Sequence, residues 1–178
     1  GKIIAADVHD HKLPLVREAC ARLGMDTVKT MLADARELGG LFPAQADKVL
    51  VDAPCSGLGV LRRRPDARWR KGPEQIAELG STQAEILEGV ARCVKDGGAL
   101  VYSTCSIEPE ENLEVVEAFL GKHPEFALDN LWPFVPVGFW RDESLEKGYL
   151  QLLPHVHGTD GFFIARMRKR GFLADRRS

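Results

Sequence analysis

The strongest constraint on the fold is a repeated pattern, in which a short apolar run ends in a polar side chain. Residues 3–7 and 48–52 are strand-like runs that each end in an aspartate, and residues 99–103 form a third such run. A helical stripe of apolar residues over 11–23 separates the first run from the next. Strands that alternate with helices predict an α/β fold with a parallel sheet.

The other expected elements follow from the same periodicities and from turn residues. We expect a strand over 27–32, a turn at Gly39-Gly40, a helix over 73–95 with a break at Gly80-Ser81, a helix over 109–120, and an antiparallel pair over 148–153 and 161–167. These elements form one domain over residues 1–170, and residues 171–178 read as a frayed tail.

Composition limits the class of protein. The chain has 178 residues and a net charge of −2, and 44% of its residues are hydrophobic, which suits a single domain with a sizeable core. It has no apolar run long enough to cross a membrane, so we expect a soluble protein. Its four cysteines form no CxxC pair, which argues against a zinc site and favours free thiols in a reducing cytoplasm.

Polar and reactive side chains follow four of the expected strands. Asp7, Asp34 and Asp52 follow three of them, and Thr104-Cys105 follows the fourth. Ligands of open α/β sheets bind at the carboxyl ends of the strands. We therefore expect these residues to belong to one site.

Two cysteines lie in segments that carry the functional signal. Cys55 is part of the segment Asp-Ala-Pro-Cys-Ser-Gly over 52–57, and Cys105 is part of Ser-Thr-Cys-Ser over 103–106, 50 residues later. Together with Pro-Glu-Glu-Asn over 109–112, they resemble the NOL/NOP/Sun family of RNA cytosine-5 methyltransferases, and within it the bacterial ribosomal RNA enzymes. The likeness extends to residues 158–165, which is nearly the whole chain.

This resemblance implies a Rossmann-like class I fold, S-adenosylmethionine as cofactor, and a cytosine of RNA as substrate, with small-subunit (16S) ribosomal RNA favoured. It also implies that Cys105 is the nucleophile and that Cys55 assists release of the methylated product. The chemistry agrees, because a thiolate added at C6 makes C5 nucleophilic, and a base must then remove the C5 proton. The alternative is that Cys55 is the nucleophile, as in DNA cytosine methyltransferases.

The acids at the strand ends suit the cofactor. The resemblance implies that Asp7 accepts the ribose hydroxyls, with Asp10 as a competing choice, and that Asp34 lies near the adenine amino group. Asp52 is placed to bind the cytosine ring edge or the cofactor amino group.

The family's first strand and its glycine-rich loop lie before the strand with which this sequence begins. Without that strand, which is central in the family's sheet, two interior strand edges would be unpaired. We expect the gap to be closed directly, or to be filled by another chain through self-association. We also expect the chain by itself to bind the cofactor weakly.

The net charge conceals a basic segment. Residues 61–71 carry a net charge of +5, whereas the rest of the chain carries −7. Such a patch binds phosphates even on an acidic protein, and Trp69 either stacks on a base or packs on the core. The predicted RNA-binding residues are Arg62, Arg63, Arg64, Arg68, Arg70 and Lys71.

Other hypotheses for the function remain open at this point. A methyltransferase that acts on an amino group is one, although it would need no second cysteine. A catalytically incompetent RNA-binding fragment is another, and a transfer RNA cytosine is an alternative substrate.

Overall fold

A computed structural model describes residues 1–69, 72–139 and 142–171. Short 3-10 turns connect many of its elements, and the turns that the site uses are η1 (Asp10–Lys12), η2 (Ala35–Glu37), η3 (Leu58–Val60), η4 (Pro65–Trp69) and η5 (Pro109–Glu111). The strands are β1 (Ile3–Asp7), β2 (Val28–Leu32), β3 (Ala46–Asp52), β4 (Val94–Thr104), β5 (Phe126–Leu128), β6 (Tyr149–Leu152) and β7 (Phe162–Lys169). The helices are α1 (Leu13–Arg22), α2 (Leu38–Leu41), α3 (Pro73–Ala91), α4 (Leu113–Lys122) and α5 (Pro154–His157).

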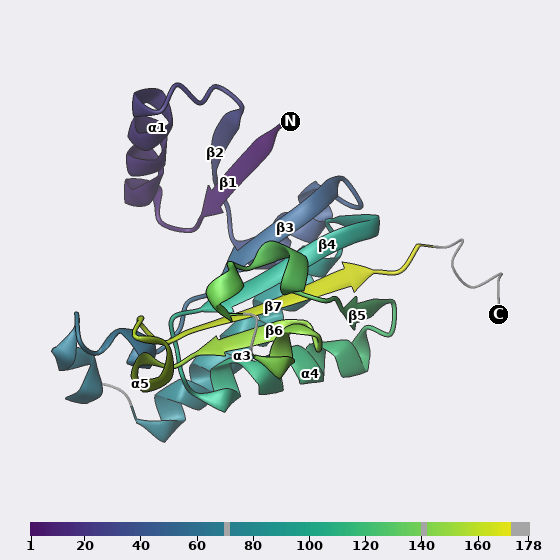
Figure 1. The fold of residues 1–178 in the computed structure, drawn as a ribbon. Coiled ribbons are helices and arrows are strands. Elements are labelled where there is room, and N and C mark those ends of the chain that lie inside the picture. The colour runs from purple at the N-terminus through teal and green to yellow at the C-terminus, as the bar shows by residue number, and fades with distance from the viewer. Residues whose placement is uncertain (70–71, 140–141, 172–178) are drawn as a thin grey trace, which may run out of the picture.

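The strands form two separate sheets (Figure 1). A small sheet holds β1 and β2, and the main sheet has the order β3-β4-β7-β5, with β6 paired to β7. The pairs β1–β2 and β3–β4 are parallel, as the alternating sequence pattern predicts. Strand β7 runs antiparallel to β4, β5 and β6, so the main sheet is mixed. The expected antiparallel pair near the C-terminus is confirmed as β6–β7, whereas β5 was not expected.

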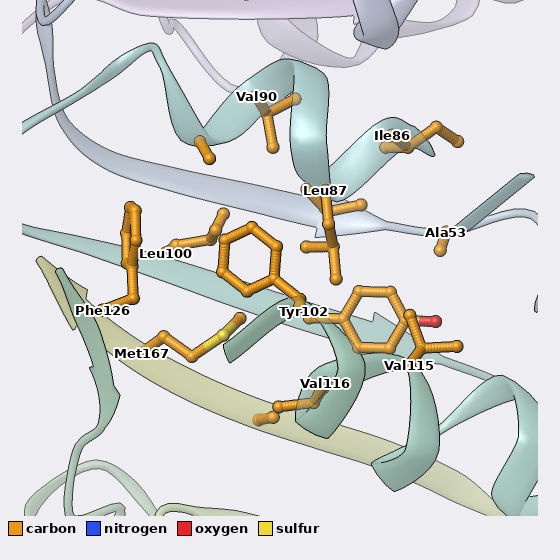
Figure 2. Close-up of a cluster of buried hydrophobic side chains, with 14 of the residues drawn as sticks. Ala53, Ile86, Leu87, Val90, Leu100, Tyr102, Val115, Val116, Phe126 and Met167 are labelled. Atoms are coloured by element: carbon orange, nitrogen blue, oxygen red, sulfur yellow. The ribbon is translucent and has the colours of Figure 1, made fainter. Parts of the chain in front are cut away.

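The hydrophobic core lies between the main sheet and helices α3 and α4. Helix α3 contributes Leu87 and Val90 from one face, which matches its helical apolar spacing. Strand β4 contributes Leu100 and Tyr102, which alternate onto that side of the sheet (Figure 2). The tyrosine hydroxyl is satisfied because it donates to the Glu111 backbone oxygen at 2.6 Å.

The small sheet buries little apolar surface. Within residues 1–33 the only buried hydrophobic side chain is Leu13, and Ile3 and Ile4 of β1 are exposed. Among the described residues β1 pairs only with β2, and β3 pairs only with β4. The two expected unpaired strand edges are therefore present, and the alternative in which β1 and β3 close the gap directly is wrong.

Three glycine positions differ from expectation. Gly39 and Gly40 lie in α2 rather than in a turn, and α3 passes through Gly80 without a break. At Gly39 and Gly80 the physical reason is close packing, because a Cβ atom on Gly39 would lie 2.4 Å from the Gly89 oxygen, and one on Gly80 would lie 2.8 Å from the Glu110 oxygen. Within the described parts of the chain, no helix combines the length and the apolar character that a membrane span requires.

Candidate active site

The two motif cysteines meet at one edge of the main sheet. Cys55 lies in the loop after β3, and Cys105 directly follows β4. These strands are parallel neighbours in which Asp52 is paired with Ser103, so both loops leave the sheet at the same end. The two sulfur atoms lie 3.2 Å apart, and both thiols are free and partly buried.

The surroundings make the two thiols unequal. The hydrogen bond from Cys55 lowers the pKa of Cys105 to about 7, and the positive charge of Arg64 acts in the same direction. Partial burial and the charge of Asp52 oppose this change. The same hydrogen bond, together with burial, raises the pKa of Cys55 far above its usual value. Near neutral pH Cys105 is therefore partly ionised, and Cys55 is the cysteine of the pair that keeps its proton.

Glycine allows the two cysteine loops to approach closely. The N–H of Gly59, in turn η3, donates to the Cys105 backbone oxygen at 3.0 Å, and the N–H of Gly161 donates to the Gly59 oxygen at 2.8 Å. A Cβ atom on Gly59 would lie 2.2 Å from the Gly161 oxygen and 2.8 Å from the Cys105 oxygen. The loop geometry at the sulfur pair thus requires glycine at position 59.

A buried polar network lies behind the cysteines, and the sequence patterns did not reveal it. The carboxylate of Glu111 accepts hydrogen bonds from Ser56 and Ser106, the residues that follow the two cysteines. The helix expected over 109–120 would place Glu110 and Glu111 in its exposed first turn. That interpretation suits the exposed Glu110, but Glu111 is fully buried. The sequence signal that could have indicated this network is the serine that directly follows each cysteine.

Asn112 supports the Cys105 loop from a second side. Its amide oxygen accepts from the Thr104 hydroxyl at 2.5 Å, and its amide nitrogen donates to the Ser106 backbone oxygen at 3.1 Å. The same nitrogen donates to the Gln151 side chain at 2.9 Å, which ties the loop to β6. Cys105 is therefore held by residues on both sides of it in the chain.

Asp52, the third predicted catalytic residue, ends β3 beside the cysteine loops. Its side chain is exposed, and the Ser103 hydroxyl lies 3.4 Å from one carboxylate oxygen. Its charge reaches Cys105, whose pKa it raises. Asp52 is thus available to a ligand at the same edge of the sheet.

The predicted cofactor acids Asp7 and Asp34 lie at the carboxyl end of the small sheet. Asp7 accepts from the His9 N–H at 2.8 Å and from Lys12 at 3.2 Å. Partial burial raises the pKa of Asp7, but these two contacts outweigh it and the pKa lies below the usual value. The competing Asp10 is exposed in η1 and does not cap a helix, since His9 precedes η1 and Lys12 precedes α1.

The carboxylate of Asp34 accepts more hydrogen bonds from the protein than the carboxylate of Asp7 does. Its carboxylate accepts from the backbone N–H and the guanidinium of Arg36, and these hydrogen bonds lower its pKa. Arg36 also binds Glu85 of α3 at 2.9 Å. An adenine amino group would therefore compete with Arg36 for this carboxylate, which has about four acceptor sites.

The structure describes the basic segment in part. Arg62 and Arg63 form ion pairs with Asp160, and Arg64 is exposed. The side chain of Arg68 and the residues Arg70 and Lys71 lie outside what the structure describes. The side chain of Trp69 is 84% exposed, so it does not pack on the core. The segment leads from the Cys55 loop, and the charge of Arg64 reaches Cys105.

Comparison with solved structures identifies the fold. The crystal structure of NSun6 from Pyrococcus horikoshii with SFG superposes on this chain with a TM-score of 0.80 and a sequence identity of 35%. The match covers 95% of this chain and 41% of the NSun6 chain. More distant solved structures share the fold, including TrmN from Thermus thermophilus at 19% identity and a TM-score of 0.55. The expected Rossmann-like, class I methyltransferase fold is confirmed.

Sequence relatives identify the family. The probable ribosomal RNA small subunit methyltransferase B of Bacillus subtilis (strain 168) is 46% identical over 176 residues, which is 96% of this chain and 38% of that protein. The ribosomal RNA small subunit methyltransferase F of Cronobacter sakazakii is 35% identical and is covered to 35% of its length. The chain thus spans less than two fifths of these relatives. Residues 1–168 match the family model described as 16S rRNA methyltransferase RsmB/F, and the chain belongs to this family.

Proposed function

We propose that this chain carries a catalytic centre that transfers a methyl group from S-adenosylmethionine to C5 of a cytosine in small-subunit ribosomal RNA. The observation that carries the proposal is the pair of sulfur atoms of Cys55 and Cys105, 3.2 Å apart at the carboxyl ends of β3 and β4. Two thiols in contact suit covalent catalysis, which requires a nucleophile and then a base.

Cys105 is the nucleophile in this proposal. Its thiolate adds to C6 of the cytosine, which gives C5 the electron density to take the methyl group. The bound cofactor would supply that methyl group as an electrophile. The low pKa of Cys105 and its position directly after β4 support this assignment over the alternative with Cys55.

Cys55 serves as the base that completes the reaction. Its pKa is raised chiefly by the hydrogen bond to the Cys105 thiolate. Once Cys105 is bonded to C6 this cause disappears, so Cys55 gives its proton to solvent more readily. The Cys55 thiolate then takes the C5 proton, the bond from C6 to Cys105 breaks, and the thiol–thiolate pair is restored.

The residues at the strand ends suit the cofactor. Asp7 retains carboxylate acceptor sites for ribose hydroxyls beside its bonds to His9 and Lys12, and Asp52 is exposed toward ligands. Asp34 would contact adenine only in exchange for part of its bond to Arg36. These residues would hold the cofactor, with Arg64 and its neighbours contacting RNA phosphates.

Adduct trapping tests the assignment of the two cysteines. The complete gene product is incubated with S-adenosylmethionine and RNA that contains 5-fluorocytosine, whose C5 fluorine blocks the last step. We expect a covalent complex that survives denaturing electrophoresis, its loss in Cys105→Ala, and its persistence in Cys55→Ala even with ordinary cytosine.

The matched control is Cys20→Ala, which removes a partly exposed thiol on α1 and should leave the complex unchanged. Loss of the adduct in Cys55→Ala with retention in Cys105→Ala would reverse the two roles. RNA binding without any adduct or methyl transfer would instead favour the non-catalytic reading. Competition between 16S ribosomal RNA and transfer RNA identifies the substrate.

A further inference from the structure

We infer that Glu111 is a positioning residue that holds the loops of Cys55 and Cys105 in register with each other. Its carboxylate is the only acidic group among the described residues that bonds to both of these loops. The catalytic consequence of this inference rests on the proposed function, but the geometric one does not.

The contacts of Glu111 divide evenly over its two oxygens. Oε1 accepts from the backbone N–H of Ser56 at 2.7 Å and from the side-chain amide of Gln83 at 3.2 Å. Oε2 accepts from the hydroxyls of Ser56 and Ser106, each at 2.5 Å. Ser56 and Ser106 directly follow the two cysteines, so one carboxylate fixes the chain beside each sulfur atom.

The carboxylate also anchors the site to the main body of the protein. Gln83 lies on α3, and its amide nitrogen donates to the Pro54 oxygen at 2.8 Å as well as to Glu111. The Tyr102 hydroxyl donates to the backbone oxygen of Glu111 at 2.6 Å. Both Gln83 and Tyr102 are fully buried, so these bonds tie the cysteine loops to the hydrophobic core.

A buried carboxylate without a cation partner indicates a specific role. Among the ion pairs of the described residues, none includes Glu111, and its side chain is fully buried. Burial of a charged group is costly unless hydrogen bonds compensate for it. Four neutral donors provide that compensation here, and a change at any of them would move a cysteine loop. Because Glu111 is sealed from solvent, it acts through the loops and does not touch substrate.

The first test measures thiol proximity without RNA or cofactor. Diamide, a diazene oxidant, adds to one thiolate. The second thiolate then attacks that sulfur, forming the disulfide and releasing the reduced hydrazine. With sulfurs 3.2 Å apart, the second step should be fast in the unaltered complete gene product. We expect Glu111→Gln to slow closure of the Cys55–Cys105 disulfide several-fold relative to alkylation of Cys105, as followed by peptide mass spectrometry.

Glu110→Gln is the matched control, because it removes the adjacent exposed acid and should leave the closure rate unchanged. Ser106→Ala removes one donor hydroxyl while leaving the carboxylate in place, and should give a smaller decrease in the same direction. Circular dichroism will show whether Glu111→Gln folds. If it does not fold, the Ser106→Ala variant keeps the test decisive. Equal closure rates in a folded Glu111→Gln protein and the unaltered protein would overturn the inference.

The second test measures methyl transfer. We expect Glu111→Gln to lower kcat roughly 100-fold, because misplacement of a reacting group by about 1 Å costs that much. The KM values for RNA and cofactor should remain within about twofold, since the mutation leaves binding residues in place. A rise in KM with unchanged kcat would also overturn the inference. Absence of methyl transfer in the unaltered protein would contradict the proposed function alone, because the disulfide test does not depend on it.

Discussion

The cysteine pair shares one proton between two chemically identical side chains, and the surroundings decide where it resides. Cys105 has a pKa of about 7, against a raised value for Cys55. Because the thiolate is the reactive form, iodoacetamide should label Cys105 with a rate that rises through pH 7. Cys55 should be labelled only after Cys105, because the Cys105 thiolate raises the pKa of Cys55 for as long as it is unmodified. Peptide mass spectrometry after labelling across pH 6–10 measures both rates.

Removal of the hydrogen-bond donor supplies the control for this prediction. Cys55→Ala should shift the labelling midpoint of Cys105 upward, because the bond from Cys55 is the largest cause of its low pKa. A midpoint of Cys105 near that of an ordinary thiol in the unaltered protein would contradict the assignment of the thiolate. An unchanged midpoint of Cys105 labelling in the Cys55→Ala protein would also contradict this assignment.

At this scale the sequence predicted which side chains lie together at the end of the sheet, but not the residues that support them. Cys55, Cys105 and Asp52 were predictable because each stands at or after a strand end, where parallel strands bring side chains together. Glu111 was not predictable as a buried residue, since an acid at a helix start is ordinarily exposed. Its burial depends on Ser56 and Ser106, which approach it only in the folded chain.

Helix α3 and turn η5 are coupled by contact at a glycine. Gly80→Ala would place a Cβ atom 2.8 Å from the Glu110 backbone oxygen, which cannot easily move. We expect a loss of about 1–3 kcal/mol in the free energy of unfolding, as is typical of overpacking. Urea denaturation measures the loss, and kcat should fall with it because η5 carries Glu111.

Gly121→Ala is the matched control on α4. Nothing lies within 4 Å of the Cβ atom that it would add, so relief of glycine's backbone entropy should make the change neutral or stabilising by about 0.5–1 kcal/mol. Equal stability changes for the two variants would show that the contact at Gly80 has no energetic consequence.

The elements themselves were largely predictable, and the two exceptions have separate causes. Apolar periodicity located β1, β2 and α3 to within a few residues. The predicted helix break at Gly80 was wrong, because a glycine inside a helix reads as a terminator when its packing partner, 30 residues away, is unknown. Strand β5 was not expected, since its three residues are too short for a period to be recognised.

The whole molecule exposes apolar side chains beside two unpaired strand edges. Leu50 of β3 is 70% exposed, and Ile4 of β1 is also exposed. Unpaired edges with apolar neighbours promote association between chains. We therefore expect the 178-residue chain to form oligomers whose proportion increases with concentration, as measured by light scattering during size-exclusion chromatography.

Leu50→Lys should reduce this association, because charge beside a strand edge opposes pairing. Val156→Lys is its control, since Val156 is similarly exposed but lies on α5, away from β1 and β3. A chain that remains monomeric at all concentrations would contradict the prediction, and so would equal effects of the two lysine variants.

The split between the sheets also has a consequence for hydrogen exchange. The unit of β1, α1 and β2 has Leu13 as its one buried hydrophobic side chain, whereas the main sheet encloses the core of Tyr102 and Leu87. Segments with little buried apolar surface open locally at a small fraction of the global unfolding free energy. Backbone amides around Asp7 should therefore exchange with deuterium long before those beside Cys105. The part of the molecule proposed to hold ribose would open and close independently of the part that holds the thiolate.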